Sequence, residues 1–243
     1  MILAVLQARS SSTRFPGKVL ADILGEPMIL RQVERLRRSE LIDHLVVATS
    51  VDESDDELAS TLTVAGVDVR RGSLDDVVAR FAAVVDAFPA DHIVRLTADC
   101  PLADFGVIDT VIRAHLASGS DYTSNTLVPT YPDGLDVECL TAHAFARLLE
   151  LPLTPREREH VTLGVYGRPE EFTLQNVSQS PDRSNLRWTV DVPDDLTFVR
   201  AIYERLYDGD SGFGQGTILR LLADHPELNR TDQDLARNAG LGN

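Results

Sequence analysis

The chain has 243 residues, a hydrophobic fraction of 43% and a formal net charge of −15. This length suits one domain with a real core, and the acidity argues against a protein that binds a nucleic-acid backbone, because such binding needs a basic surface. No apolar run approaches the roughly 20 residues of a membrane span and no signal peptide is evident, so we expect a cytoplasmic protein without a membrane partner.

The first half of the chain alternates between expected strands and expected helices. Short continuous apolar runs indicate strands buried on both faces, and apolar residues at helical spacing indicate helices that pack on a sheet. In chain order we expect strands at 2–6, 45–49, 67–69 and 93–96, and helices at 27–38, 55–65, 74–88 and 105–117. This alternation predicts an α/β fold whose sheet is mostly parallel and carries helices on both faces.

After about residue 120 the pattern changes. We expect strands at 121–124 and 135–140 that form a small β-hairpin insertion, with Gly134 in the connecting loop. Thr141 suits the N-cap of the following helix, and Asp194 and Asp195 suit the first turn of a later one. The remaining expected elements are a helix at 141–151, strands at 172–174 and 186–190, helices at 193–207 and 217–222, and a polar tail. The prediction is a single domain over 1–243 with an insertion around 120–150.

The only lysine of the chain, Lys18, lies in the loop after the first expected strand, whereas the other 22 of the 23 basic residues are arginines. Lysine is a compact point charge and does not exchange with arginine where one phosphate oxygen must be reached. The same loop holds Arg9, Arg14, the small residues 10–13, and Gly17, which permits unusual backbone angles. Ligands of open α/β sheets bind at the carboxyl ends of strands, so we predict a phosphate site here. The alternative is one lysine that survived an arginine-favouring genome.

The segment ARSSSTRFPGKVL at 8–20, followed by GEPMI at 25–29, resembles the signature loop of sugar nucleotidyltransferases. It is most similar to their cytidylyltransferase branch, which includes the 3-deoxy-manno-octulosonate and acylneuraminate enzymes and the spore-coat-polysaccharide group. The resemblance implies a Rossmann-like fold of the nucleotide-diphospho-sugar transferase (GT-A-like) kind, with CTP held by this loop. It implies catalytic, phosphate-binding roles for Arg14 and Lys18. It also implies nucleotide contacts from Leu6, Gln7, Ala8, Arg9, Ser10, Ser11 and Gly17.

Asp99 follows an expected strand in the segment RLTADCPL, so its carboxylate should emerge at the carboxyl edge of the sheet. Mg²⁺ in nucleotide sites takes one or two carboxylates together with phosphates and waters. The resembling family has its first metal aspartate in such a context, which implies that Asp99 is a Mg²⁺ ligand and that Thr97 and Ala98 contact the nucleotide. From the residues alone, an aspartate that caps the next helix is an equal alternative.

Asp191 ends the expected strand 186–190, within LRWTVDVPDDL. Carboxylates at the ends of two strands can converge on one ion, and the family's second metal aspartate lies in such a segment. The resemblance therefore implies that Asp191 is the second Mg²⁺ ligand, while Asp194 and Asp195 fit a helix start better. The cysteines, Cys100 and Cys139, form no CxxC pair, which argues against a zinc site or a disulfide framework.

The segment RRGSLDDVVARF at 70–81 is similar to the spore-coat group, in which a Gly-Ser pair and a following Asp and Arg lie near the nucleotide. The similarity implies that Gly72 and Ser73 approach the base or ribose, with Asp76 and Arg80 nearby. An equal alternative is a helix start in which Ser73 is the N-cap and Asp75 and Asp76 occupy the first turn.

The segment YPDGLDVE at 131–138 also resembles the spore-coat group, where it lies close to the acceptor. Asp136 and Glu138 would share one face of a strand and bind acceptor hydroxyls or an amine. The alternative is the solvent face of an edge strand. His160, in REREHV, is a candidate contact for an acidic acceptor group, against the alternatives of a solvated helix face or a structural histidine.

Together with these features, the resemblance implies a Mg²⁺-dependent cytidylyltransferase, and the choice of cytosine rests on the resemblance alone. An acceptor oxygen would attack the α-phosphorus of CTP, giving a CMP-linked product and pyrophosphate, with the protein supplying positioning and charge stabilisation. The acceptor would be a sugar acid, a sugar derivative or a small phosphorylated compound, and the insertion around 120–150 would bind it or form a homodimer. The alternatives are a nucleotide-sugar-dependent glycosyltransferase, whose usual DxD metal motif is absent around Asp191, and a non-catalytic nucleotide-binding subunit.

Overall fold

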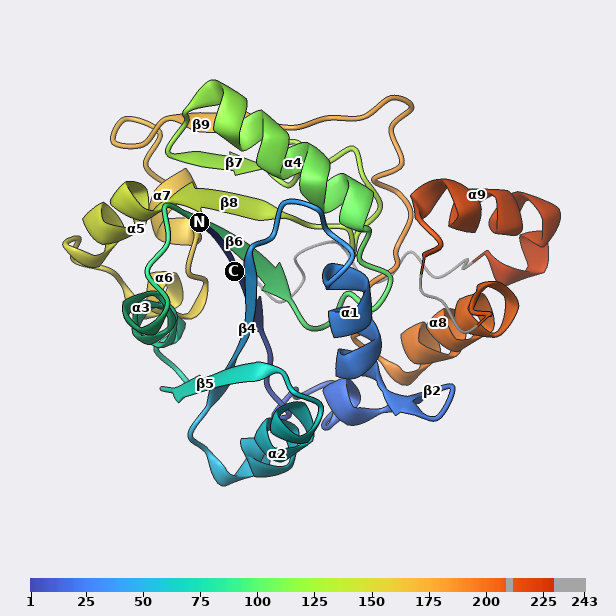
Figure 1. The fold of residues 1–243 in the computed structure, drawn as a ribbon. Coiled ribbons are helices and arrows are strands. Elements are labelled where there is room, and N and C mark those ends of the chain that lie inside the picture. Colours follow the sequence, from blue (N-terminus) through green and yellow to red (C-terminus); the bar gives the residue numbers. More distant parts are fainter. Residues whose placement is uncertain (209–211, 230–243) are drawn as a thin grey trace.

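The computed structural model describes residues 1–208 and 212–229, within which seven strands form one sheet in the order β5–β4–β1–β6–β8–β7–β9 (Figure 1). Strand β8 runs antiparallel to its neighbours β6 and β7, and the other neighbouring pairs are parallel. The strands are β1 Ile2–Gln7, β4 His44–Ser50, β5 Asp68–Gly72, β6 His92–Thr97, β7 Tyr122–Ser124, β8 Glu138–Thr141 and β9 Leu174–Asn176, and β2 Asp22–Ile23 and β3 Glu26–Pro27 form a separate hairpin. The expected α/β fold with a mostly parallel sheet is confirmed.

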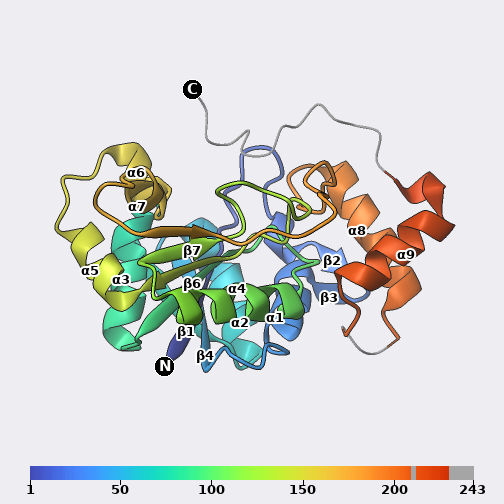
Figure 2. The same cartoon turned by 90° about the horizontal axis from the view of Figure 1, so that it is seen from above.

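Helices cover both faces of the sheet because successive strand residues point to opposite sides. In β1, Ala4 and Leu6 face one buried cluster, whereas Leu3 and Val5 face the other. The first cluster draws on α1 Met28–Leu36, α2 Asp56–Val64, α4 Phe105–Ser118, α8 Pro193–Leu206 and α9 Gln215–Asp224. The second draws on α3 Val77–Ala87, α5 Ala142–Leu149 and α7 Leu163–Tyr166, with α6 Pro155–Glu159 lying against α3. Figure 2 shows the chain starting at one edge of this assembly and the loop after β1 rising at the opposite edge.

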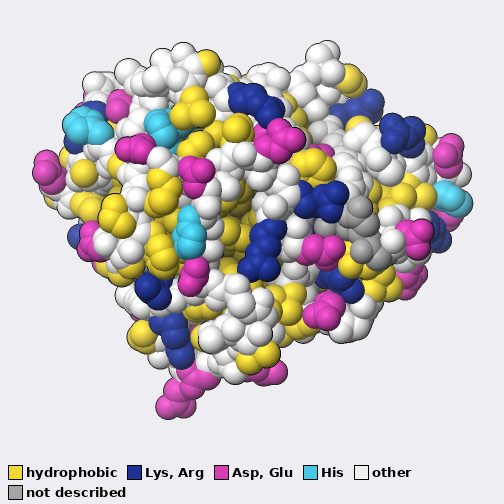
Figure 3. All heavy atoms as spheres, in the orientation of Figure 1, with side chains coloured by type: hydrophobic (Ala, Val, Ile, Leu, Met, Phe, Trp, Pro, Cys, Tyr) yellow, Lys and Arg dark blue, Asp and Glu magenta, His cyan; other side chains and the backbone are white. Residues whose placement is uncertain are grey.

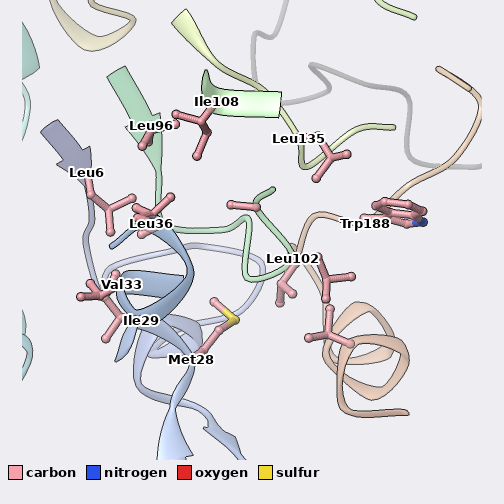
Figure 4. Packing of buried hydrophobic residues seen from close by; sticks show 14 of the residues in the cluster. Leu6, Met28, Ile29, Val33, Leu36, Leu96, Leu102, Ile108, Leu135 and Trp188 are labelled. Carbon is pink, nitrogen blue, oxygen red and sulfur yellow. The ribbon is translucent and has the colours of Figure 1, made fainter. Parts of the chain in front are cut away.

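Trp188 anchors the segment before α8 to the main core. Its side chain is 1% exposed and belongs to the cluster that also contains Met28, Leu102 and Leu135 (Figure 4). Burial of a side chain of this size is among the larger single contributions to a core. The packing of Trp188 therefore ties the segment that leads to Asp191 to the main core.

Residues 186–190 do not form the expected strand and make one isolated bridge to Asp133 instead. Their backbone bonds to loops, since Trp188 N donates to Asp133 O (2.6 Å) and Val190 N donates to Asp99 O (2.8 Å). An apolar extended segment has the same sequence pattern whether its partner is a strand or a loop. The predicted strand was wrong, but the segment still ends at the carboxyl edge of the sheet.

Helix α3 begins later than expected. Asp76, and not Ser73, is its N-cap and accepts a hydrogen bond from Ala79 N (2.9 Å), while Ser73 Oγ accepts from Asp76 N (3.0 Å). Thr141 caps α5 as expected, with its hydroxyl accepting from Ala144 N (3.0 Å). Both caps satisfy amides that a helix start leaves without intrahelical partners.

The hairpin around 120–150 lies within the main sheet, because β7 and β8 pair with each other and β8 also pairs with β6. Strand β8 begins at Glu138, so Asp136 precedes it and does not share a strand face with Glu138 as expected. Helices α6 and α7 were not predicted, and most of the expected polar tail falls outside the described residues. None of the described helices is long and apolar enough to cross a membrane.

Acidic and basic side chains are interspersed on the face shown in Figure 3, with hydrophobic side chains between them. The positive charge on this face is therefore distributed in small groups. In a chain with a net charge of −15, several cations placed together favour anion binding against the negative background.

Candidate active site

A cavity of about 510 Å³ opens at the carboxyl ends of β1 and β6. The loop after β1, the end of β6 and the segment before α8 form one side, and residues 126–138 with α6 and α7 form the other. This is the edge at which open α/β sheets bind ligands. The cavity brings together eight of the predicted site residues: Arg9, Arg14, Thr97, Asp99, Asp136, Glu138, His160 and Asp191.

Lys18 connects the two predicted metal ligands. Its Nζ donates to Val190 O (2.6 Å) and to Asp191 Oδ1 (3.1 Å), and it lies 3.7 Å from Asp99 Oδ2. The side chain is only 8% exposed, so the ammonium does not point into bulk solvent. Two carboxylates that are far apart in the sequence therefore meet beside one cation.

The donor set fits a divalent cation that arrives with phosphates. Asp99 and Asp191 offer carboxylate oxygens, the ligands that Mg²⁺ prefers, and both side chains line the cavity. Within residues 1–208 and 212–229, no group of three or more His, Cys, Asp or Glu side chains is placed to hold a metal by itself. A metal ion at this position would need phosphate and water oxygens to complete its coordination.

Asp191 is surrounded by cations. Besides Lys18, Arg14 Nη2 lies 3.0 Å from Oδ1 and Arg187 Nη2 lies 2.7 Å from Oδ2. Burial alone would raise the pKa of Asp191, but these three positive charges outweigh it and hold the pKa below its usual range. The backbone is fixed as well, because Asp195 Oδ2 accepts from Asp191 N (2.6 Å). The carboxylate is thus ionised and held in one orientation.

The loop after β1, residues 8–18, is the predicted phosphate loop. Asp55, which was not predicted as a site residue, holds this loop in place. Its fully buried carboxylate accepts from Ser10 N (2.6 Å) and from the amide and hydroxyl of Ser50 at the end of β4. The loop also closes on itself, since Gly17 N donates to Ser10 O (2.8 Å) and Gly17 has a φ of 73°. The left-handed backbone angle is the reason that glycine suits this position.

Some predicted nucleotide contacts lie behind the site. Leu6, Ala8 and Ala98 are at most 3% exposed and belong to the core. The amides of Ala8 and Ala98 are bonded within the sheet, to Ala48 O (3.1 Å) and Gln7 O (2.9 Å). Their small or apolar side chains therefore shape the floor of the site and do not line the cavity.

Gly72, Ser73, Asp76 and Arg80 form a separate group on the β5 side, outside the cavity lining. Arg80 is 1% exposed and its Nη1 donates to Ser73 O (3.0 Å), while Nε and Nη2 have no partner among the described residues. Burial lowers the pKa of Arg80 to about 10. A Cβ on Gly72 would lie 3.1 Å from Arg80 Cγ, so the glycine makes room for the arginine stem. Both carboxylate oxygens of Asp76 are engaged, by the N-cap bond and by Arg158 Nη1 (2.8 Å).

On the acceptor side, Glu138 lines the cavity, but its carboxylate is engaged by other side chains of the protein. Its carboxylate accepts from Tyr122 OH (2.6 Å) and Thr162 Oγ1 (2.6 Å) and forms an ion pair with Arg95. The side chain is 7% exposed, so the structure assigns it to holding Arg95 in place. His160 lines the cavity, and burial, followed by nearby arginines, lowers its pKa.

Two arginines of the cavity were missed by sequence reasoning. Arg95 is the single charged residue in the apolar strand 93–96, and Arg187 lies four residues before Asp191. A lone charge in a buried strand is a usable signal, because such a group must find a partner. Asp55 carried no such signal, since it sits in a run of acidic residues that resembles a helix start.

A profile of the family described as "Cytidylyltransferase" matches residues 3–208. The chain belongs to the cytidylyltransferase family.

The Spore coat polysaccharide biosynthesis protein SpsF of Bacillus subtilis is 34% identical over 212 residues, which cover 84% of this chain and 87% of that protein. The 3-deoxy-manno-octulosonate cytidylyltransferase of Geobacter sulfurreducens is 39% identical over 128 residues, covering 52% and 49% of the two chains. A solved cytidylyltransferase structure from Leptospira borgpetersenii superposes with a TM-score of 0.90 at 26% identity, covering 97% of this chain and 99% of that one. The protein is thus a nucleotidyltransferase enzyme.

Proposed function

We propose that this cytidylyltransferase transfers CMP from CTP to a small-molecule acceptor, with Mg²⁺ on the phosphates and release of pyrophosphate. The observation that carries the proposal is the convergence of Asp99 and Asp191 on the Lys18 ammonium, with Arg14 beside them. Cations and carboxylates mixed at one sheet edge suit a polyphosphate that arrives with a divalent cation. Family membership and the relatives named above support the choice of CTP.

The residues of the chain supply positioning and charge. Lys18 and Arg14 would donate to phosphate oxygens and stabilise the charge that passes to pyrophosphate when the acceptor oxygen bonds to the α-phosphorus. Ser10 supports this role, because its buried hydroxyl has no partner in the described part of the chain. When bound, Mg²⁺ on Asp99 and Asp191 would neutralise and orient the phosphates. The ion pairs of Arg14 and Lys18 with Asp191 support this role, because they keep both cations beside the proposed metal ligands.

The nucleoside and the acceptor would bind on opposite sides of the phosphate loop. Gly72, Ser73 and Arg80 lie on the β5 side, which favours the base and ribose there. The open cavity lies on the β6 and β8 side, and Asp136 and His160 line it. We therefore propose that the cavity takes the acceptor, a sugar acid, a sugar derivative or a small phosphorylated compound.

The two alternatives have less support. A glycosyltransferase would leave unexplained why Lys18 and Arg14 converge on the aspartates. A non-catalytic nucleotide-binding subunit would not need two carboxylates and their cations to stay together. Release of pyrophosphate from CTP and an acceptor separates the proposed reaction from both.

A matrix of four nucleoside triphosphates against candidate acceptors, with Mg²⁺ and a pyrophosphate readout, tests the proposal. We expect turnover with CTP, and we expect K18A and D99A to lose turnover while circular dichroism shows that they remain folded. R113A is the matched control, because Arg113 lies on α4 with its side chain 57% exposed. Full activity in K18A or D99A would reject the assigned roles.

A further inference from the structure

The far end of the cavity is built from hydrogen-bond donors. Arg95, Thr97 and Asp99 alternate along β6 and its end, and all three line the cavity. Strand β6 ends at Thr97, and Asp99 lies in the turn that follows. At a rise of about 3.3 Å per residue, the Cα atoms of Arg95 and Thr97 are separated by about 7 Å. The cavity thus runs from the carboxylates of the proposed phosphate site to a guanidinium at its other end.

Arg95 is a fixed cation. Glu138 holds it from behind and is itself fixed by Tyr122 OH and Thr162 Oγ1. Arg95 Nη2 makes a long bond to Gln7 Oε1 (3.3 Å), and Nε has no partner among the residues that the structure describes. Because Nε is buried, the donor capacity that remains for a ligand lies at Nη2, whose bond to Gln7 is long. The planar guanidinium is already oriented, which suits a carboxylate or phosphate.

The surroundings of Arg95 add positive charge and further donors. His160, Tyr166 and Arg9 line the same cavity, and Arg9 Nη2 lies 3.7 Å from Glu159 Oε1. Burial lowers the pKa of His160, and Glu159 opposes the shift, whereas Arg95 and Arg9 add to it. His160 therefore lies within electrostatic range of both of these arginines.

We infer that Arg95, with His160 and Tyr166, forms an anion subsite for a carboxylate, phosphate or phosphonate group of the acceptor. The inference rests on the proposed function for the direction of transfer, since the attacking oxygen must lie near Asp99. The acceptor then carries its anionic group several bonds away from that oxygen. Arg95 selects the acceptor, and Glu138 is a positioning residue that acts through Arg95.

Histidine NMR on the full chain tests this inference without knowledge of the acceptor. The Cε1–Hε1 signal of His160, assigned with H160Q, is followed during titrations with sodium acetate, sodium methylphosphonate or methylammonium chloride at constant ionic strength. We expect a saturable shift with at least one of the two anions and a higher pKa of His160, because a bound anion stabilises the imidazolium. A response to acetate indicates a carboxylate group, and a response to methylphosphonate indicates a phosphate or phosphonate group.

R95Q should weaken the anion response by about tenfold or more, which corresponds to about 1.4 kcal/mol. R95K keeps a cation beside Glu138 but loses the planar guanidinium, so it should also weaken the response, because the subsite uses the planar arrangement of donors. R113Q, a substitution on the exposed face of α4, should respond like the wild type. An unchanged response in folded R95Q and R95K, or an equal shift with methylammonium, would overturn the inference.

A parallel measurement separates this inference from the proposed function. CTP affinity is measured on the same proteins, and K18Q should lose CTP binding but keep the anion response at His160. R95Q should show the reverse. A wild-type protein that does not bind CTP contradicts the proposed function, while the response of His160 still decides whether the anion subsite exists.

Discussion

Lys18 sits where two carboxylates and a backbone carbonyl meet, and it is almost fully buried there. A guanidinium is larger and planar, and it could not reproduce these contacts in the same space. This explains why a chain that otherwise uses arginine has lysine at this position. It also implies that the shape of the cation matters in addition to its charge.

The first prediction is that K18R loses activity although it keeps the positive charge. We expect the turnover number for pyrophosphate release to fall by about 100-fold, similar to the loss of one donor to a developing anion. The reciprocal control is R113K on α4, which should retain wild-type turnover. Wild-type activity in K18R would show that charge alone is required at this position.

The second prediction concerns a pair formed by the buried His115 and the half-buried His92, neither of which lines the cavity. His115 Nε2 contacts His92 Nδ1 (3.1 Å), and His115 Nδ1 contacts Thr123 Oγ1 (3.1 Å). Burial, followed by the neighbouring His92, lowers the pKa of His115 to about 4 from its usual 6.5. Between pH 4 and 6.5 the unfolded chain binds more protons at this histidine than the folded chain does. The contribution of the neutral His115 to stability is therefore fully present above pH 6.5 and falls as the pH is lowered.

This single group should reduce the free energy of unfolding by up to about 1.4 kcal/mol per pH unit between pH 6.5 and 4. Urea unfolding of the wild type and H115Q across this range measures the difference in slope. H143Q is the control, because His143 is exposed on α5. Equal slopes for the wild type and H115Q would contradict the buried, neutral histidine.

At the scale of elements, the segment that carries Asp191 is positioned by a close approach of two loops. Gly134 has a φ of 105°, and a Cβ at this position would lie 2.7 Å from Thr189 N and 2.7 Å from Trp188 C. Side chains avoid both this backbone angle and this contact. The glycine therefore allows the loop after β7 to pack against the segment that leads into α8.

The third prediction compares two glycines with left-handed backbones. G134A should cost about 3 kcal/mol of stability and lower turnover, because it displaces the segment that ends at Asp191. G66A has a similarly unfavourable φ of 66° but open space around the added Cβ, so it should cost about 1 kcal/mol and leave turnover unchanged. Equal losses in urea unfolding for the two variants would show that the close approach has no role.

The sequence predicts those elements whose burial follows a simple pattern. Strands at 2–6, 45–49 and 93–96 were recovered because both faces of a central parallel strand are apolar. The expected strand at 186–190 failed because the same pattern fits a segment that pairs with loops. Helices α6 and α7 were missed because they are short and mostly polar or half-buried.

The site was predictable only in part, because the sequence reveals residues that lie in a local signature but not residues that act through tertiary contacts. Lys18, Arg14, Asp99 and Asp191 lie in segments whose spacing carries a recognisable signature, and the structure brings them together. Asp55 and other residues that act through tertiary contacts have no local pattern that distinguishes them from ordinary surface charges.

For the whole molecule, a net charge of −15 sets the background against which a nucleoside triphosphate must bind. Three cations of the site, Arg14, Lys18 and Arg187, are ion-paired with Asp191, so part of their positive charge is already compensated. In the proposed function, a divalent cation that arrives with the nucleotide would supply further positive charge. The homodimer that the family resemblance implies stays a prediction, and light scattering that gives the mass of a single chain would contradict it.

The fourth prediction is that CTP with Mg²⁺ stabilises the folded protein as a whole. At a CTP concentration of 100 times Kd, the gain is about 2.7 kcal/mol, which raises Tm by about 5–10 °C for a chain of this size. Thermal unfolding with and without the ligand measures it. K18Q should show almost no increase, whereas R113Q should match the wild type.

The most direct test of the shared site is calorimetric titration of CTP into the wild type, K18Q and D99N, each with Mg²⁺ and with a chelator. We expect K18Q to bind CTP weakly in both conditions, because it lacks the cation that contacts the phosphates. D99N should lose affinity only when Mg²⁺ is present. Wild-type affinity of both variants in the presence of Mg²⁺ would contradict a site in which the lysine and the two aspartates hold one nucleotide and one metal ion together.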